Sequence, residues 1–298
     1  MPIVVTLVAP PSTAIPAAAI EAVREVGGGR AEATWLEADR ACDVVIGAAT
    51  GSARSALRRP LADALCGFAV DWAVQADGRR RKRLLVSDMD STITEQECID
   101  EIADFAGLRG EVAGITRRAM AGELDFVAAL QERVALLAGL GEDVLGRVMA
   151  DRITVTPGAA TLVATMRRHG AYTVLVSGGF TFCAADIAAR LGFDTYRANR
   201  LIVESGRLAG RVGEPVLDRA AKLESLLAAC SRLGIEPDDA LGLGDGANDL
   251  GLIETAGLGV AYRAKPILAN AANALIEHGD LTAALFFQGY RREEFALA

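Results

Sequence analysis

The fold is decided by the stretch Leu84-Leu85-Val86-Ser87-Asp88-Met89-Asp90-Ser91-Thr92, in which a short apolar run ends in two aspartates. Basic residues precede the run and polar residues follow it, which is typical of a buried strand. Carboxylates at the carboxyl end of such a strand project into the crevice where open α/β sheets bind ligands. Taken alone, the Asp-x-Asp motif also fits a solvated turn, so further motifs have to decide.

The two aspartates suggest a specific chemistry. Asp88 and Asp90 repel each other and are stable as anions only beside a cation. Mg²⁺ prefers oxygen ligands and is the cation we expect here. With a metal bound, one carboxylate can attack phosphorus as a nucleophile, and the other can serve as acid and base.

Three further polar motifs follow along the chain. Val174-Leu175-Val176 leads into Ser177-Gly178-Gly179, and Leu241-Gly242-Leu243-Gly244 leads into Asp245-Gly246-Ala247-Asn248-Asp249. Lys222 lies between them in a helical stretch, where a lone lysine is usually solvated. The glycines around Asp245 do not suit a dinucleotide site, because they bracket a negative charge where pyrophosphate needs bare backbone.

In this order, the motifs resemble those of the haloacid dehalogenase-like superfamily, and most closely those of its phosphoserine phosphatases. The resemblance covers roughly residues 80–290. It implies Mg²⁺-dependent hydrolysis of O-phosphoserine to serine and phosphate through an aspartyl-phosphate intermediate, the final step of serine biosynthesis. No nucleic acid or membrane partner is implied, only a small-molecule substrate.

The resemblance also implies a role for each motif residue. The catalytic set is Asp88 as nucleophile, Asp90 as acid and base, Ser177, and Lys222. The metal ligands are Asp88, the backbone carbonyl of Asp90, and Asp245, while Asp249 orients a metal-bound water or holds Lys222. For Asp249, a simple helix cap is the alternative.

The substrate-binding residues come from both sides of the expected site. Glu97 matches the family position that meets the substrate ammonium, and Arg133 the position that meets its carboxylate. The helical pattern by itself would predict that Glu97 and Arg133 are ordinary exposed charged residues. The remaining positions exclude water, hydrogen-bond the substrate, or hold phosphoryl oxygens; they are Met120, Phe126, Asn248, Ser177, Gly178 and Gly179.

Residues 1–78 form a first unit with the order strand, helix, strand, strand, helix, strand, which is the ferredoxin-like pattern. It resembles an ACT domain, although Pro10 and Pro11 stand where ACT ligand sites have glycine. We therefore favour a structural or dimerising role, with a possible homodimer through this unit, over amino-acid sensing. Trp35 and Trp72 are expected in its core or interface.

Residues 79–298 form the phosphatase-like unit. Between about 95 and 153 the pattern is purely helical, which predicts a helical-bundle cap inserted after the first core strand. From there strands alternate with helices, which predicts a Rossmann-like α/β core with a mostly parallel sheet. Thr195 to Val203 is predicted as one strand of a hairpin, and Leu258 to Tyr262 as the last clear strand.

The amino-acid composition limits the class of protein, its binding partners and its cellular compartment. The chain has 298 residues, 51% of them hydrophobic, and a net charge of -8, which indicates a globular protein and argues against nonspecific binding of polyanions. Arg79 to Arg83 is expected to be a solvated linker. The five cysteines are odd in number and not closely spaced, so we expect neither a disulfide framework nor zinc, as in a reducing cytoplasm. No run reaches the ~18 apolar residues of a membrane helix.

Two alternatives of different class remain. One is a phosphotransferase or a phosphatase for another small amino-alcohol phosphate, because the core motifs determine the reaction and not the substrate. The other is a non-catalytic amino-acid-sensing regulator. All the catalytic motif residues are present, which favours the enzyme.

Overall fold

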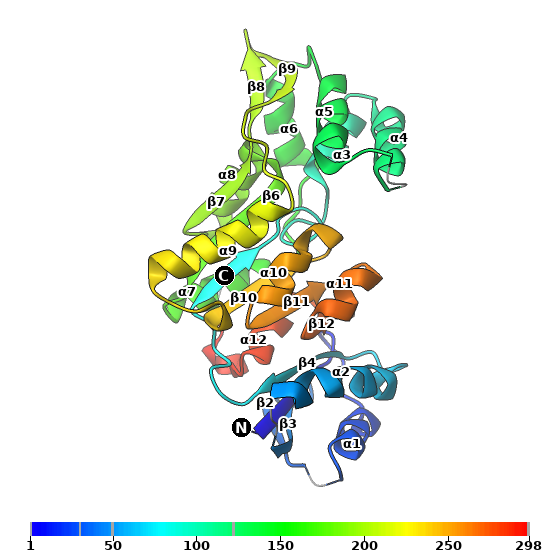
Figure 1. The fold of residues 1–298 in the computed structure, drawn as a ribbon, viewed down its shortest axis with the longest axis vertical. Coiled ribbons are helices and arrows are strands. Elements are labelled where there is room, and N and C mark those ends of the chain that lie inside the picture. Colours follow the sequence, from blue (N-terminus) through cyan, green and yellow to red (C-terminus); the bar gives the residue numbers. More distant parts are fainter. Residues whose placement is uncertain (1, 30, 49–50, 121–122, 297–298) are drawn as a thin grey trace.

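The computed structural model describes residues 2–29, 31–48, 51–120 and 123–296. The N-terminal unit is at one end of an elongated molecule, the core is in the middle, and the cap is at the far end (Figure 1). A single ten-stranded sheet runs through the first two parts, in the order β2-β3-β1-β4-β12-β11-β10-β5-β6-β7.

The N-terminal unit has the predicted element order. Its strands pair only in antiparallel fashion with one another, and its elements are β1 (Pro2–Val8), α1 (Ala17–Val26), β2 (Ala33–Glu37), β3 (Ala41–Ala48), α2 (Gly51–Leu65) and β4 (Asp71–Ala76). The strand order β2-β3-β1-β4 is that of a split βαβ unit. Trp72 is buried in this unit, whereas Trp35 is 39% exposed, so of the two expected positions for Trp35 only the interface stays as a prediction.

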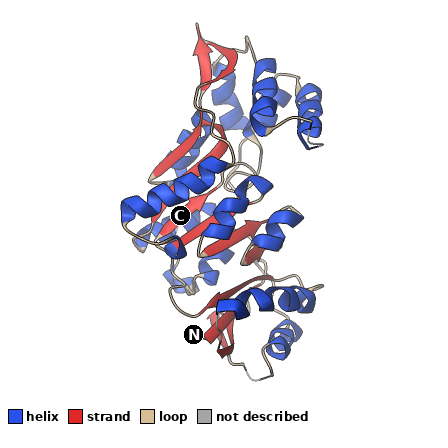
Figure 2. Cartoon of the chain, viewed as in Figure 1, coloured by secondary structure: helices blue, strands red, loops and turns tan. Residues whose placement is uncertain are grey.

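The core sheet is parallel, as predicted. Its strands are β5 (Leu84–Ser87), β6 (Tyr172–Phe180), β7 (Thr195–Asn199), β10 (Ala240–Gly244), β11 (Leu258–Tyr262) and β12 (Ala274–Ile276). The chain leaves β5 toward β6 on one side and returns as β10 on the other. The carboxyl end of β5 is therefore the topological switch point, where open α/β sheets bind ligands. Every residue of β5 is buried, because helices cover both faces (Figure 2).

Helices cover the core sheet. They are α7 (Ala159–Arg168), α8 (Thr181–Leu191), α9 (Ala220–Leu233), α10 (Leu250–Thr255), α11 (Pro266–Ala271) and α12 (Ala283–Phe287). Gly192 ends α8 and Gly234 ends α9, both with positive φ, a conformation that glycine adopts without a steric cost. Among the described residues no helix is long and apolar enough to cross a membrane.

The cap consists of α3 (Cys98–Phe105), α4 (Arg109–Met120), α5 (Phe126–Leu136) and α6 (Asp143–Asp151). All four helices lie between residues 95 and 153, where the sequence predicted a helical-bundle cap. α3 buries Ile99, Ile102 and Ala103 on one face, and the Asp125 side chain caps α5 by accepting a hydrogen bond from the Ala128 N–H at 2.7 Å.

The predicted strand Thr195–Val203 is two strands. β7 ends at Asn199 and pairs with β6, and β8 (Leu201–Glu204) forms a separate hairpin with β9 (Arg207–Val212). Figure 1 shows the hairpin beside the cap helices. Backbone hydrogen bonds join the two, including Gly139 N–H to Leu208 O at 2.8 Å, so the hairpin is an extension of the cap.

The expected solvated linker is exposed at Arg79, Arg81 and Arg83, but the expectation was wrong for Arg80 and Lys82. Arg80 pairs with Asp43 of β3 at 2.6 Å and donates to the Phe287 carbonyl, and Lys82 is 8% exposed. β12, which the sequence did not reveal, pairs antiparallel with β4 and joins the two units into one sheet. The segment after β4 is therefore a structural junction.

One disulfide is present that the sequence did not predict. Cys98 of α3 and Cys183 of α8 form a disulfide, although 85 residues separate them in sequence. Cys42, Cys66 and Cys230 are free, so the bond is isolated and does not belong to a disulfide framework.

Candidate active site

The motif residues meet at the carboxyl edge of three adjacent strands. Asp88 follows β5, the Ser177 motif forms the end of β6, and Asp245 follows β10. The Asp88 N–H continues the ladder by donating to the Leu243 carbonyl at 2.9 Å. Strand pairing thus places the carboxylates at one edge of the sheet, as the strand-end rule predicts.

A small cavity lies over this edge, between the core and the cap. Its volume is about 120 Å³, and its lining comes from both parts: Asp88, Asp90, Glu97, Ile99, Phe126, Arg133, Gly178, Gly179, Asp245, Gly246, Asn248 and Lys265. Larger hollows exist elsewhere, such as the cleft of about 850 Å³ between α2 and α11, but none of the predicted site residues lines that cleft. The chemistry is therefore concentrated in a small space that the cap covers.

Lys222 is buried beneath the cavity and joins two carboxylates. Its Nζ lies 2.8 Å from Asp88 Oδ1 and 2.5 Å from Asp249 Oδ1, and the lysine side chain is 2% exposed. The other oxygen of Asp249 accepts the N–H groups of Asp245 and Gly246 at 3.2 and 3.1 Å. Asp249 therefore holds both Lys222 and the loop that carries Asp245, which is more than a simple helix cap does.

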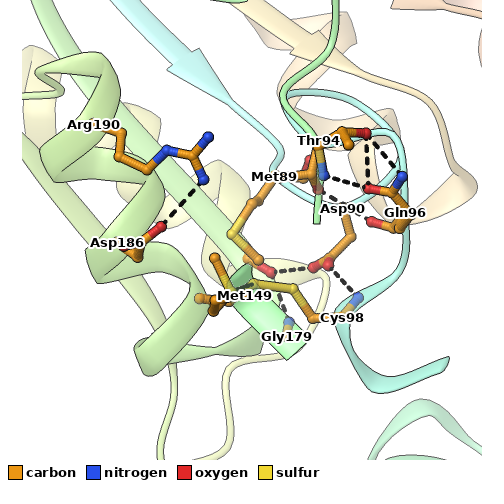
Figure 3. The surroundings of a disulfide bond; sticks show 12 residues. Met89, Asp90, Thr94, Gln96, Cys98, Met149, Gly179, Asp186 and Arg190 are labelled. Carbon is orange, nitrogen blue, oxygen red and sulfur yellow. Dashed lines mark hydrogen bonds and ion pairs between the residues drawn. A yellow bond between two sulfur atoms is a disulfide. The ribbon is translucent and has the colours of Figure 1, made fainter. Parts of the chain in front are cut away.

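Asp90 is held from two sides. Its Oδ1 accepts the Cys98 N–H at 2.9 Å, and its Oδ2 accepts the Ser177 hydroxyl at 2.7 Å (Figure 3). The Ser177 oxygen in turn accepts the Gly179 N–H at 2.7 Å. A Cβ at Gly179 would lie 2.6 Å from Asp90 Oδ2, so only glycine fits here.

The carboxylates raise one another's pKa values. Burial, followed by the charge of Asp249, raises the pKa of Asp88 well above its usual value, against the opposing charge of Lys222. Burial and the charge of Glu97 raise the pKa of Asp90 to about 7. Burial and the charge of Asp249 raise the pKa of Asp245 to about 6. Burial by itself would lower the pKa of Lys222, but the negative charges of Asp88 and Asp249 outweigh the effect of burial and raise this pKa.

These residues fit a divalent metal. Carboxylate oxygens of Asp88, Asp245 and Asp249 lie within 4.8 Å of one another, and the raised pKa values of Asp88 and Asp245 show a need for more positive charge. An all-oxygen donor set suits a hard cation. Both oxygens of Asp249 are already engaged, which leaves Asp88 and Asp245 as the better ligands.

The cap residues face the same cavity. Glu97 accepts a hydrogen bond from the Ser91 hydroxyl at 2.9 Å, and the Arg133 Nε donates to the Ala129 carbonyl at 3.2 Å. Burial lowers the pKa of Arg133, against the nearby charges of Asp100, Glu97 and Asp90. Phe126 covers Gly178 so closely that a Cβ there would lie 3.0 Å from its ring.

One predicted residue, Met120, is not described at the cavity, whereas one cavity residue, Lys265, was not predicted. Met120 is the last residue of α4, and its side chain lies outside the part of the chain that the structure describes. Lys265 lines the cavity although the sequence reasoning missed it. It follows the end of β11 by three residues, so the strand-end rule that indicated Asp88 would also have indicated Lys265.

The comparisons with known proteins agree with this geometry. The family model for haloacid dehalogenase-like hydrolases matches residues 85–254. The phosphoserine phosphatase of Streptomyces coelicolor is 40% identical over 99% of this chain and 72% of its own length. A crystal structure of a probable phosphoserine phosphatase from Vibrio cholerae has a TM-score of 0.78 at 30% identity, over 98% of this chain and 88% of the other.

A third relative bears on the site itself. It is a solved structure of a phosphoserine phosphatase with a phospho-aspartyl intermediate analogue, with a TM-score of 0.65 at 41% identity, over 70% of this chain and 99% of the other. The chain belongs to the haloacid dehalogenase-like hydrolases. Within that family it is a phosphatase, which removes the non-catalytic alternative.

Proposed function

We propose that this phosphatase hydrolyses O-phosphoserine to serine and phosphate. The observation that carries the proposal is the shared cavity, where Glu97 and Arg133 of the cap face Asp88 and Asp90 of the core. O-phosphoserine has an ammonium and a carboxylate besides its phosphate, and these two cap residues supply the complementary charges. A guanidinium can bind a carboxylate in two-pronged fashion. The names of the relatives support the same substrate.

The core residues divide the chemistry between them. Asp88 attacks phosphorus, because Lys222 and the Met89 N–H hold its Oδ1 in place at 2.8 Å each. Asp90 protonates the leaving serine oxygen and then takes a proton from the hydrolytic water. Its pKa of about 7 lets both protonation states exist near neutral pH, as acid–base catalysis requires. The analogue bound in the related structure supports the aspartyl-phosphate route.

The remaining residues bind and orient. Ser177, Gly178 and Gly179 hold phosphoryl oxygens, and the bare backbone of the glycines allows a close approach. Asn248 hydrogen-bonds the substrate from the core side, and Phe126 excludes water. Asp88 and Asp245, together with the Asp90 carbonyl, would hold Mg²⁺, which would supply positive charge for the transferring phosphoryl group.

The wider context follows from this reaction. Its product is free serine, so the final step of serine biosynthesis is the proposed role. A cytoplasmic location and a homodimer through the N-terminal unit stay predictions. The disulfide weakens the basis of the first, since that expectation rested on unpaired cysteines.

Phosphate release across a small panel of phosphomonoesters tests the substrate. Arg133→Ala removes a charge-assisted contact worth about 1.5–3 kcal/mol. We expect kcat/KM for O-phosphoserine to fall roughly ten- to a hundredfold, while p-nitrophenyl phosphate, which has neither group, changes little. Phosphoethanolamine lacks the carboxylate and should be insensitive to Arg133 but sensitive to Glu97→Gln.

Arg147→Ala is the matched control, because Arg147 is an exposed cap arginine that pairs with Asp143 on its own helix. Equal losses on all substrates would mean that Arg133 supports the cap fold. An O-phosphoserine rate that neither Arg133→Ala nor Glu97→Gln changes would remove the basis for this substrate and favour another amino-alcohol phosphate.

A further inference from the structure

The disulfide joins the cap to the core beside the active site. Cys98 is the first residue of cap helix α3, and Cys183 lies in the first turn of core helix α8. Both side chains are almost fully buried, at 1% and 0% exposure. The bond is thus a covalent tie between cap and core.

The two segments that the disulfide joins also hold the carboxylate of Asp90. The Cys98 N–H donates to one oxygen of Asp90, and the Ser177 hydroxyl donates to the other (Figure 3). Ser177 belongs to β6, which runs directly into the helix that carries Cys183. Glu97, which lines the cavity, immediately precedes Cys98. Any movement of α3 away from α8 would therefore open the site.

Such movement is needed for turnover. The active-site cavity of about 120 Å³ is much smaller than the ~300–1,000 Å³ of ordinary ligand pockets, so the cap is closed. Substrate entry and product release then require the cap to lift. The chain enters the cap through residues 91–97 and leaves it through residues 152–157, where Thr94 and Val155 pair. Cys98 lies just past this hinge, so the disulfide holds the cap at its base.

A groove on the surface lies close to the disulfide, although neither cysteine lines it. It has a volume of about 510 Å³ and runs between α6 of the cap and α8 of the core, lined by Gly146, Met149, Phe182, Asp186 and Arg190 among others. Met149 lines this groove, and its Sδ lies 3.2 Å from Cys183 Sγ; Figure 3 shows Met149 near Cys98. Because a methionine side chain is flexible, a small thiol in the groove has only to displace Met149 to reach the Cys183 sulfur.

We propose that Cys98–Cys183 is a redox latch, reduced through this groove by a small dithiol and re-formed by a small disulfide, and that only the reduced enzyme opens freely. A thiolate of the dithiol attacks Cys183 Sγ, the protein disulfide breaks, and Cys98 leaves as a thiolate that takes up a proton. The second thiol of the reductant then attacks the mixed disulfide and releases Cys183. Two electrons pass from the dithiol to the protein, and a small disulfide reverses the sequence.

The test uses the full chain treated with reduced or oxidised dithiothreitol. Alkylation followed by intact mass should show two more free thiols in the reduced protein. Hydrogen exchange in residues 91–97 and 152–157 should be faster after reduction. Because its kinetic part rests on the proposed function, kcat/KM is measured on both O-phosphoserine and p-nitrophenyl phosphate, and it should rise at least roughly fivefold on reduction.

Variants separate the latch from a general effect of reductant. Cys183→Ser should behave like the reduced wild type under either treatment, whereas Cys230→Ser, which alters a free buried cysteine, should keep the response. Met149→Ala should speed the reduction of the disulfide. The latch is refuted if oxidation does not lower the number of free thiols, or if hydrogen exchange at the hinge is equal in the reduced and oxidised proteins. It is also refuted if kcat/KM of Cys183→Ser still changes with the redox treatment.

The thiol count and the hydrogen exchange need no substrate. Their failure therefore refutes the latch alone. Failure to hydrolyse O-phosphoserine, with these two signatures intact, refutes only the proposed substrate.

Discussion

Replacing Lys222 by methionine should destabilise the metal-free protein in a pH-dependent way. The ammonium of Lys222 is buried between Asp88 and Asp249, at 2.8 and 2.5 Å. Removing one partner of a buried ion pair costs about 3–5 kcal/mol, because the remaining charge is stranded in a poorly solvated site. That is a large share of the ~5–15 kcal/mol by which proteins are typically stable.

The pH dependence follows from the raised pKa of Asp88. Burial already holds this pKa well above its usual value, and losing Lys222 raises it further. A carboxyl group with a raised folded-state pKa is neutral at low pH and destabilises the fold as pH rises through that pKa. The loss should therefore be largest near about pH 8 and smaller near about pH 5, where the stranded carboxyl takes up a proton.

Urea unfolding in the presence of a chelator measures both effects. Lys265→Met is the control, because Lys265 is exposed at the same cavity and its loss should cost no more than about 0.5 kcal/mol. The double variant Lys222→Met/Asp249→Asn removes one stranded carboxylate and should recover at least ~1 kcal/mol relative to Lys222→Met alone. Equal losses at both pH values, or a double variant no more stable than Lys222→Met, would refute the ion-pair argument.

Asp88→Asn should abolish turnover, and the wild type should form a beryllofluoride adduct at Asp88; more than a small residual rate would contradict the aspartyl-phosphate route. Chelation should remove activity and Mg²⁺ should restore it, while Ca²⁺ should bind but support turnover poorly; full activity in chelator would contradict a metal site. Glu97→Gln removes a charge that raises the pKa of Asp90, so the alkaline limb of the kcat profile should move to lower pH, and an unmoved limb would mean that Asp90 is not the titrating acid. A chain that begins near Gly78 should keep the chemistry but lose solubility, since β12 would expose the edge that β4 covers; a folded but inactive product would contradict the two-domain interpretation.

The sequence by itself determined the core and the location of its chemistry. Apolar runs that end in Asp88, Ser177 and Asp245 predicted strands with polar groups at one edge, and the structure places these strands side by side. This succeeds because buried parallel strands leave a continuous apolar signal, and because parallel strands present their carboxyl ends at one edge. The cap helices were predictable for a similar reason, since their periodicity and caps are local.

Tertiary structure alone decided the features that depend on distant neighbours. β12 has three residues, too few for a pattern, and it exists because β4 and β11 flank it. From the sequence, Arg80 was expected to be a solvated linker residue, but the fold places its guanidinium 2.6 Å from the Asp43 carboxylate. The Cys98–Cys183 pair spans 85 residues, and no local signal indicates that the start of α3 lies beside the start of α8. Contacts of this kind depend on how the elements dock, which local propensity does not encode.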